Sequence, residues 1–250
     1  MNEITKGGTG YLSGFTLKII AIMTMTCDHI AEHWWYECAE VWEMLPVYMR
    51  MIGKLTFPIL VYLFVEGYYH TRDRTKYLSR IAIFAAISTY PFYLADGSPW
   101  NVLFTFLVGM MLLISKDKTV DLFPSIPEGF WMAVYFLIAM FASYELRMCD
   151  WGFPGIIAIY VAGQVKNIKV RAFVPGVILF SGQMLRCYVE QVLRIDNIII
   201  YGGCLLSIGL LLLYNGQRGY DKGWWVKYLF YIYYPAHLLV IYWIKTVYWV

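Results

Sequence analysis

The stretch FTLKIIAIMTMTCDHIAEHWW, residues 15–35, is long enough to cross a lipid bilayer as a helix, yet three titratable side chains interrupt its apolar run. They are Lys18, Asp28 and His29. Ionisable groups are costly in hydrocarbon, so at membrane depth they mark candidate functional sites. At about 100° per residue, Lys18 and His29 return to within roughly 20° of one helix face and lie about 16 Å apart along the axis. The stretch therefore predicts a membrane helix that carries a cation and an imidazole along one stripe.

The composition of the chain indicates an integral membrane protein. Of its 250 residues, 60% are hydrophobic and 15% are charged, whereas soluble domains carry about 25% charged residues. A helix needs roughly 20 apolar residues to span a bilayer. We therefore predict one domain, 1–250, that is all-α and polytopic, with nine transmembrane helices at 13–36, 48–69, 77–95, 99–115, 130–146, 151–165, 171–190, 197–214 and 228–247. The blocks 99–115 and 151–165 are short, so each fits a tilted, broken or re-entrant segment.

Loops on alternate sides of this predicted bundle differ in charge. Lys and Arg gather in four of them, at 70–80, 115–129, 164–171 and 215–227. Because such loops stay on the cytoplasmic side, we predict a cytoplasmic N-terminus, an outer C-terminus and an uncleaved first helix as anchor. This bias accounts for the net charge of +3, and no feature of the sequence indicates nucleic-acid binding.

The predicted orientation places a second charge at the depth of Lys18. The second span runs from the outer face inward, so Glu66 arrives near the cytoplasmic end of the membrane, with His70 one turn further on. We expect Glu66 to pair with Lys18. A lone buried ion pair is a poor source of stability, so this pair indicates function rather than packing.

Asp28 needs a partner other than its neighbour His29. Adjacent residues on a helix point about 100° apart, so the carboxylate does not easily reach the imidazole. We expect Asp28 to pair with Arg50 or His237 on a neighbouring span. His237 follows Pro235, which kinks a helix and frees carbonyl groups that membrane proteins tolerate near polar groups or cavities.

Two further patterns offer ligand sites. His29, Glu32 and His33 form an H-x-x-E-H run, and two His at i and i+4 can ligate zinc, but no third ligand is evident, so we expect no metal. The turn from Asn215 to Gly219 pairs backbone donors with Arg218, which suits a phosphate, although a solvated turn fits equally well.

The five cysteines show no C-x-x-C spacing. We interpret them as packing residues, with a disulfide permitted among the three near the predicted outer side, Cys38, Cys149 and Cys187.

Several separated motifs resemble one known family, the TraX family of membrane proteins associated with acetylation of conjugative pilin. The resemblance covers nearly the whole chain. It rests on LKIIAIMTMTCDHI (17–30), RMIGKLTFPILVYLFVEGYYHTRDRTKYLSRIAIFAAISTYPF (50–92), NVLFTFLVGM (101–110), the D-x-G-x-x-G of Asp150, Gly152 and Gly155, LYNGQRG (213–219) and KYLFYIYYPAHLL (227–239). The basic residue, ten intervening residues and His of the first span also look like the signature of the wider acyltransferase-3 type membrane enzymes.

The resemblance implies a membrane-embedded acetyltransferase in a bacterial cytoplasmic membrane. Acetyl-CoA would be the cytoplasmic co-substrate, and an exported peptide such as a pilin, a glycan or a small molecule would be the acceptor on the outer side. The resemblance to the acyltransferase-3 enzymes implies that the His is catalytic and that the basic residue helps to hold acyl-CoA. Direct transfer and an acetyl-histidine intermediate both remain open.

The resemblance and the predicted depths together assign three groups of residues. His29 acts as general base, because imidazole has a pKa near the operating pH. The candidate catalytic residues are His29, Asp28 and His237. The candidate acetyl-CoA site, in which Arg forks suit phosphates, comprises Lys18, Glu66, His70, Arg72, Arg80, Asn215 and Arg218. The candidate acceptor site comprises Arg50, Trp100, Asn101 and Asp150.

A proton-coupled transporter is the alternative function. It would use Lys18–Glu66 and Asp28–His237 as proton relays, but transporters show internal repeats or paired broken helices, and we find no repeat. A purely structural protein has no reason to keep so many intramembrane charges.

Overall fold

The computed structural model describes residues 10–144, 150–220 and 224–248, and these ranges fold into eleven α-helices. Their bounds are α1 (Gly14–His33), α2 (Trp35–Val41), α3 (Leu45–Gly53), α4 (Thr56–His70), α5 (Arg74–Asp96), α6 (Val102–Leu122), α7 (Glu128–Tyr144), α8 (Gly152–Ala162), α9 (Ile168–Val189), α10 (Ile195–Leu212) and α11 (Trp224–Tyr248). The all-helical prediction is confirmed over the described residues.

Each predicted apolar block coincides with one helix or, at 48–69, with the pair α3 and α4. The short helix α2 was not predicted. Block 99–115 is longer than expected, because α6 continues to Leu122. Block 151–165 is short: α8 has 11 residues, a rise of about 16 Å, which is less than the roughly 30 Å of a bilayer core.

Four helical segments are long and apolar enough to cross a membrane: Leu45–His70, which joins α3 and α4, and α5, α9 and α10. Helices on the outside of the bundle also expose large apolar side chains, such as Ile87, Leu137, Val177, Leu206 and Val240. Apolar surface of this extent is unfavourable in water and favourable in lipid. The chain is thus a membrane protein, while the nine crossings and their orientation remain predictions.

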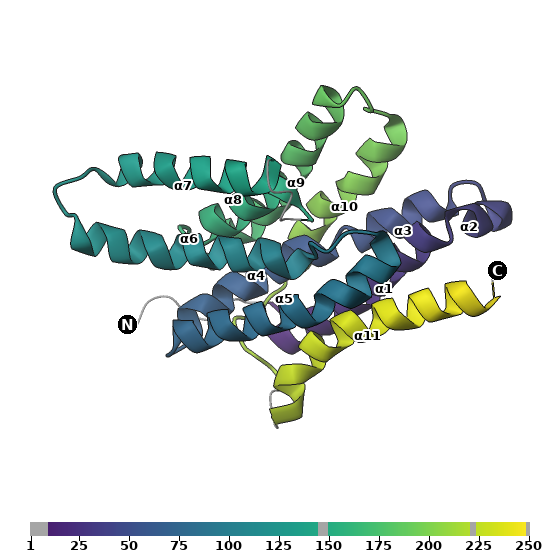
Figure 1. Ribbon diagram of the computed structural model, residues 1–250, viewed down its shortest axis with the longest axis horizontal. Helices are drawn as coiled ribbons and strands as arrows, with labels where there is room; N and C mark the ends of the chain where they lie inside the picture. Colours follow the sequence, from purple (N-terminus) through teal and green to yellow (C-terminus); the bar gives the residue numbers. More distant parts are fainter. Residues whose placement is uncertain (1–9, 145–149, 221–223, 249–250) are drawn as a thin grey trace.

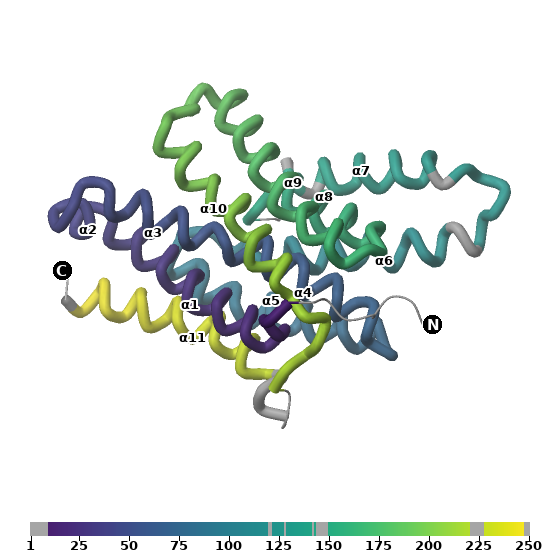
Figure 2. Tube along the Cα trace, turned by 180° about the vertical axis from the view of Figure 1, so that it is seen from behind, coloured from purple at the N-terminus to yellow at the C-terminus, as the bar shows by residue number. Residues whose placement is uncertain are grey.

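Helix α4 occupies the centre of the fold, with ten of its 15 residues buried. It packs against α1, α8, α9 and α10, and α11 packs against α1 and α5. The hairpins α6–α7 and α9–α10 project from this core in different directions (Figures 1 and 2). The end of α11 at the C-terminus lies beside the end of α1 where α2 follows, in both views.

The break between α3 and α4 brings α1 and α10 close to the charged centre of the fold. Pro58 cannot donate a hydrogen bond to the carbonyl of Lys54 four residues earlier, and the helix ends there. The thiol of Cys204 in α10 lies 3.7 Å from that free carbonyl and donates to it. On the other side, a Cβ on Gly53 would lie 2.2 Å from Cβ of Asp28. Glycine at this position therefore permits the close approach of α1.

This close approach gives a stability prediction. Gly53→Ala forces a methyl group into Asp28, so we expect a loss of about 1–3 kcal/mol from overpacking, measured by thermal unfolding in detergent. Gly209→Ala in α10 is the matched control, because nothing lies within 4 Å of its added Cβ. There the better helix propensity of alanine should raise stability by up to about 1 kcal/mol. Equal melting temperatures for the two variants would contradict this account of the packing.

Candidate active site

Two histidines that are far apart in the sequence meet between α1 and α11. The ring centroids of His29 and His237 lie 5.2 Å apart in an edge-to-face arrangement. Nδ1 of His237 lies 3.0 Å from the carbonyl oxygen of Tyr233. A carbonyl only accepts, so Nδ1 carries the proton and Nε2 of the neutral ring has a free lone pair. That Nε2 atom is buried and has no hydrogen-bond partner among the described residues.

Asp28 faces away from this histidine pair, toward α3. Its carboxylate lies 2.9 Å from Nζ of Lys54 and 3.2 Å from Nε of Arg50. Arg50 also reaches Glu32, at 2.6 Å. The expected partnership of Asp28 with Arg50 is confirmed, Lys54 is an additional partner, and His237 contacts His29 instead. The network fixes the rotation of α1 and so directs His29 toward α11.

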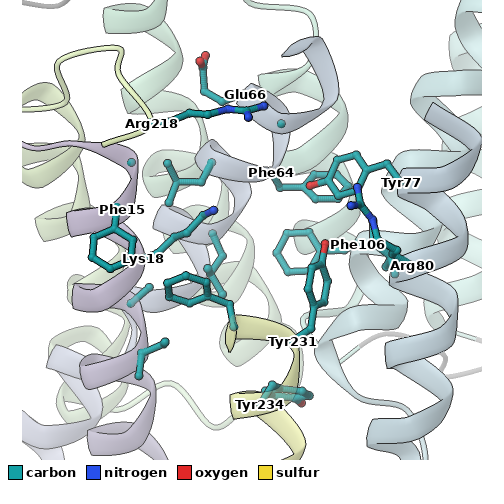
Figure 3. Close-up of a pocket in the computed structure, with 18 of the residues that line it drawn as sticks. Phe15, Lys18, Phe64, Glu66, Tyr77, Arg80, Phe106, Arg218, Tyr231 and Tyr234 are labelled. Atoms are coloured by element: carbon teal, nitrogen blue, oxygen red, sulfur yellow. The ribbon is translucent and has the colours of Figure 1, made fainter. Parts of the chain in front are cut away.

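A cavity of about 470 Å³ opens beside the N-terminal half of α1. Figure 3 shows the Lys18 amine and Tyr231 pointing into this space, with Arg80 beside Tyr77 and Arg218 beside Glu66. Aromatic side chains from five helices contribute to the wall, among them Phe15, Phe64, Tyr77, Phe106 and Tyr234. The cavity thus combines an apolar, aromatic lining with three cations, a surface that suits an amphipathic anion.

Five of the seven residues predicted to bind the co-substrate line this cavity: Lys18, Glu66, His70, Arg80 and Arg218. Arg72 and Asn215 do not line it. Asn215 accepts a hydrogen bond from the backbone of Gln217 instead.

The turn at 215–219 serves mainly to hold the start of α1. Its carbonyl groups at Gln217 and Arg218 accept from the backbone N–H groups of Gly14 and Phe15. Gly219, at φ 78°, closes the turn. The turn therefore caps a helix N-terminus and positions Arg218, and it is not a cradle of free backbone donors.

The expected pair of Lys18 and Glu66 is absent. Glu66 bonds instead to Arg171 of α9, whose side chain is fully buried, and lies 3.4 Å from His70. Lys18 has no carboxylate within ion-pair distance among the described residues, and its amine lies over the ring of Phe230. The prediction failed because Arg171 was assigned to a cytoplasmic loop, whereas the structure places it inside the bundle. Lys18 therefore remains available to an anion in the cavity.

A second cavity, of about 280 Å³, lies at the other end of α1. It is lined by His33, by Leu94 and Ala95 of α5, and by Tyr242, Lys245 and Thr246 of α11. Sequence reasoning did not identify it. Along α1 the first cavity ends at Met25 and the second begins at His33, so His29 lies between the two.

The same order holds along α11. Tyr234 lines the first cavity and Tyr242 the second, and His237 falls between them. Phe92, Tyr234 and Leu238 form a buried apolar cluster at this level. Along both helices the two histidines thus lie between the residues that line the two cavities, and they line neither.

The predicted acceptor residues are not gathered at either cavity. Asn101 is fully buried; its amide donates to the carbonyl of Ala85 and its side-chain oxygen caps α6. Trp100 packs edge-on against Phe104, and Arg50 is held by carboxylates. Asp150 is exposed and lines neither cavity. Asn101 is therefore a structural residue, which corrects its assignment to the acceptor site, whereas Arg50, Trp100 and Asp150 line neither cavity and their role stays a prediction.

These ion pairs also bear on the transporter alternative. Neither of its two proton-relay pairs forms, since Glu66 and Asp28 bond to other cations.

The described cysteines are free thiols, namely Cys27, Cys38, Cys187 and Cys204, and Cys149 lies outside the described residues.

The sequence matches the model of one protein family, described as TraX protein, over residues 13–245. The chain belongs to the TraX family. Its relatives include a probable fimbrial assembly protein, FimC of serogroup H1, from Dichelobacter nodosus, which is 27% identical over 92% of this chain and 94% of its own length. No solved structure matches this TraX chain.

The buried ion pair of Arg171 with Glu66, which the sequence did not predict, should be important for stability. In this TraX chain, Arg171→Met leaves the Glu66 carboxylate uncompensated, and we expect a loss of about 3 kcal/mol. The double variant Arg171→Met/Glu66→Leu should recover most of that loss. Unfolding in detergent measures both.

The exposed pair of Arg186 and Glu190, at 2.9 Å, supplies the control. Arg186→Met should change stability by less than about 1 kcal/mol. A similar loss in Arg186→Met and Arg171→Met, or no recovery in the double variant, would show that Glu66 does not depend on Arg171.

Proposed function

We propose that this TraX-family protein is a membrane-embedded acetyltransferase that moves an acetyl group from acetyl-CoA to an amine or hydroxyl of an exported acceptor. One observation carries the proposal. The His29–His237 pair lies between a basic, aromatic cavity and a second cavity, and the same order holds on α1 and α11. Such an arrangement suits a reaction in which donor and acceptor approach a base from opposite sides.

The first cavity has the character of a co-substrate site. Lys18, Arg80 and Arg218 supply charge for phosphates, and Arg presents paired donors to phosphate oxygens. The apolar and aromatic part of the lining leads from these cations to Met25 and Tyr234, one turn from the histidines. A ligand with an anionic head and a long uncharged arm matches this gradient.

His29 is the proposed general base. It accepts the proton of the acceptor while the acceptor nitrogen or oxygen bonds to the acetyl carbon. The carbon–sulfur bond breaks, and the proton passes to the departing sulfur. His237 contacts His29 edge-on and positions its ring. Asp28, through Arg50 and Lys54, holds α1 in the rotation that this requires.

The acceptor is proposed to enter by the second cavity. The name of the relative from Dichelobacter nodosus refers to fimbrial assembly, and this supports a subunit of a surface fibre as the acceptor class. The charge distribution of the loops supports a cytoplasmic first cavity and an outer second cavity, in a bacterial cytoplasmic membrane.

Binding of acetyl-CoA by purified protein in detergent tests the first cavity. Lys18→Ala and Arg218→Ala should each weaken binding by about tenfold or more, because each removes a charged donor to phosphate. Arg72→Ala, which removes an exposed cation outside the cavity, is the matched control and should bind like the wild type. Calorimetric titration gives the dissociation constants. Equal weakening by all three variants would mean that general surface charge, not the cavity, attracts the ligand.

Turnover tests the histidine. His29→Ala should bind acetyl-CoA as the wild type does, yet release free CoA about 10²- to 10⁴-fold more slowly, as expected for loss of a general base. His237→Ala should have a smaller effect, since it positions the ring of His29. Thiol release in the presence of peptide-amine acceptors is the measurement. Wild-type protein that binds no acetyl-CoA would refute the acetyltransferase, whereas full activity in His29→Ala would refute the assigned base.

A further inference from the structure

Three metal-ligating side chains converge at the end of α1 near the second cavity. They are His29 and His33, one turn apart on α1, and Asp96 at the end of α5. One ligand atom from each lies within 4.8 Å of the other two. The sequence supplied the two histidines at i and i+4, but Asp96 is 63 positions further along the chain, and the fold alone brings it to them.

The histidine nitrogens in this group lack the partners that buried polar atoms need. Nδ1 of His29 and Nε2 of His33 are buried and make no hydrogen bond among the described residues. Nε2 of His33 lies 3.4 Å from Oδ1 of Asp96, without hydrogen-bond geometry. The His33 side chain is only 6% exposed. A buried polar atom without a partner costs free energy. A further component that accepts lone pairs from all three side chains would remove this cost.

The local charge favours a cation as that component. Asp28 and Glu32 are matched by Arg50 and Lys54. Asp96 has no Lys or Arg within ion-pair distance among the described residues, and its partner there is His33. Lys245 also lines the second cavity, but it forms no ion pair with Asp96.

We propose that His29, His33 and Asp96 bind a Zn²⁺-type transition-metal ion. Two imidazoles and a carboxylate are ligands that zinc prefers, at about 2 Å from the metal, which sets neighbouring ligand atoms of a tetrahedron roughly 3.3 Å apart. His33 and Asp96 already have this spacing. The ligand atom of His29 lies within 4.8 Å of the other two, so its ring moves closer to them when all three side chains bind one ion. The second cavity, which His33 lines, is the entry path and leaves the fourth position open to water.

The bound ion would act as an inhibitor. This consequence rests on the proposed function, because a ring nitrogen of His29 that ligates zinc stabilises no transferred proton and the ring is no longer free to act as a base. Zinc in the outer compartment would then inhibit the transfer reaction without occupying the co-substrate cavity.

Metal binding is measured first, without acetyl-CoA, on purified full-length protein that carries no polyhistidine tag. Co²⁺ serves as a spectroscopic probe of tetrahedral coordination, and Zn²⁺ is titrated calorimetrically. We expect one ion per chain, with affinity lowered by more than about a hundredfold in His33→Ala and in Asp96→Asn. His70→Ala is the matched control, because it removes a histidine beside a carboxylate at the other cavity. Its metal affinity should equal that of the wild type.

Inhibition is measured next, on turnover of acetyl-CoA. Zinc should slow the wild type, while Asp96→Asn should keep its basal turnover and lose most of its sensitivity to zinc. Absence of metal binding by the wild type, or binding that neither His33→Ala nor Asp96→Asn weakens, overturns the proposed site. Metal binding at this site in a protein that shows no turnover would leave the site standing and refute only the acetyltransferase.

Discussion

The buried ion pairs of Asp28 with Arg50 and Lys54 hold this fold and its candidate site in register. They form where α3 ends, because Pro58 interrupts the hydrogen bonding of the helix at Lys54. Gly53 then permits α1 to approach within contact of the break. Charges buried in a membrane protein must be paired, so the rotation of α1 is fixed by this contact. The direction of His29 is a consequence of that rotation.

The level of the histidine pair is the second organising feature. Phe92 of α5 and Tyr234 and Leu238 of α11 form a buried apolar cluster there. His29 and His237 meet at the same level, between the residues of α1 and α11 that line the two cavities. Neither histidine belongs to the lining of a cavity.

Local patterns predicted a large part of this arrangement. Lys18 was identified because titratable groups in apolar helices are few, and Arg80 because it lies in the basic segment 70–80. Helix geometry predicted that Asp28 pairs with a neighbouring span rather than with His29; it left Arg50 and His237 both open, and the structure shows Arg50. One failed prediction concerns a residue at the end of a helix. Asn101 was expected to face an acceptor and instead caps a helix, which its position just before an apolar block could have indicated.

The sequence by itself determined the helical membrane class, the apolar blocks and the stripe that joins Lys18 to His29, because each of these depends on spacing within one helix. Tertiary structure alone decided the partners. Arg171 rather than Lys18 pairs with Glu66, and Asp96 joins His29, because such contacts depend on how helices are rotated and offset against one another. That rotation is set by packing at positions such as Gly53. Because glycine has no side chain there, α1 can approach closely, and this approach determines which charged groups meet.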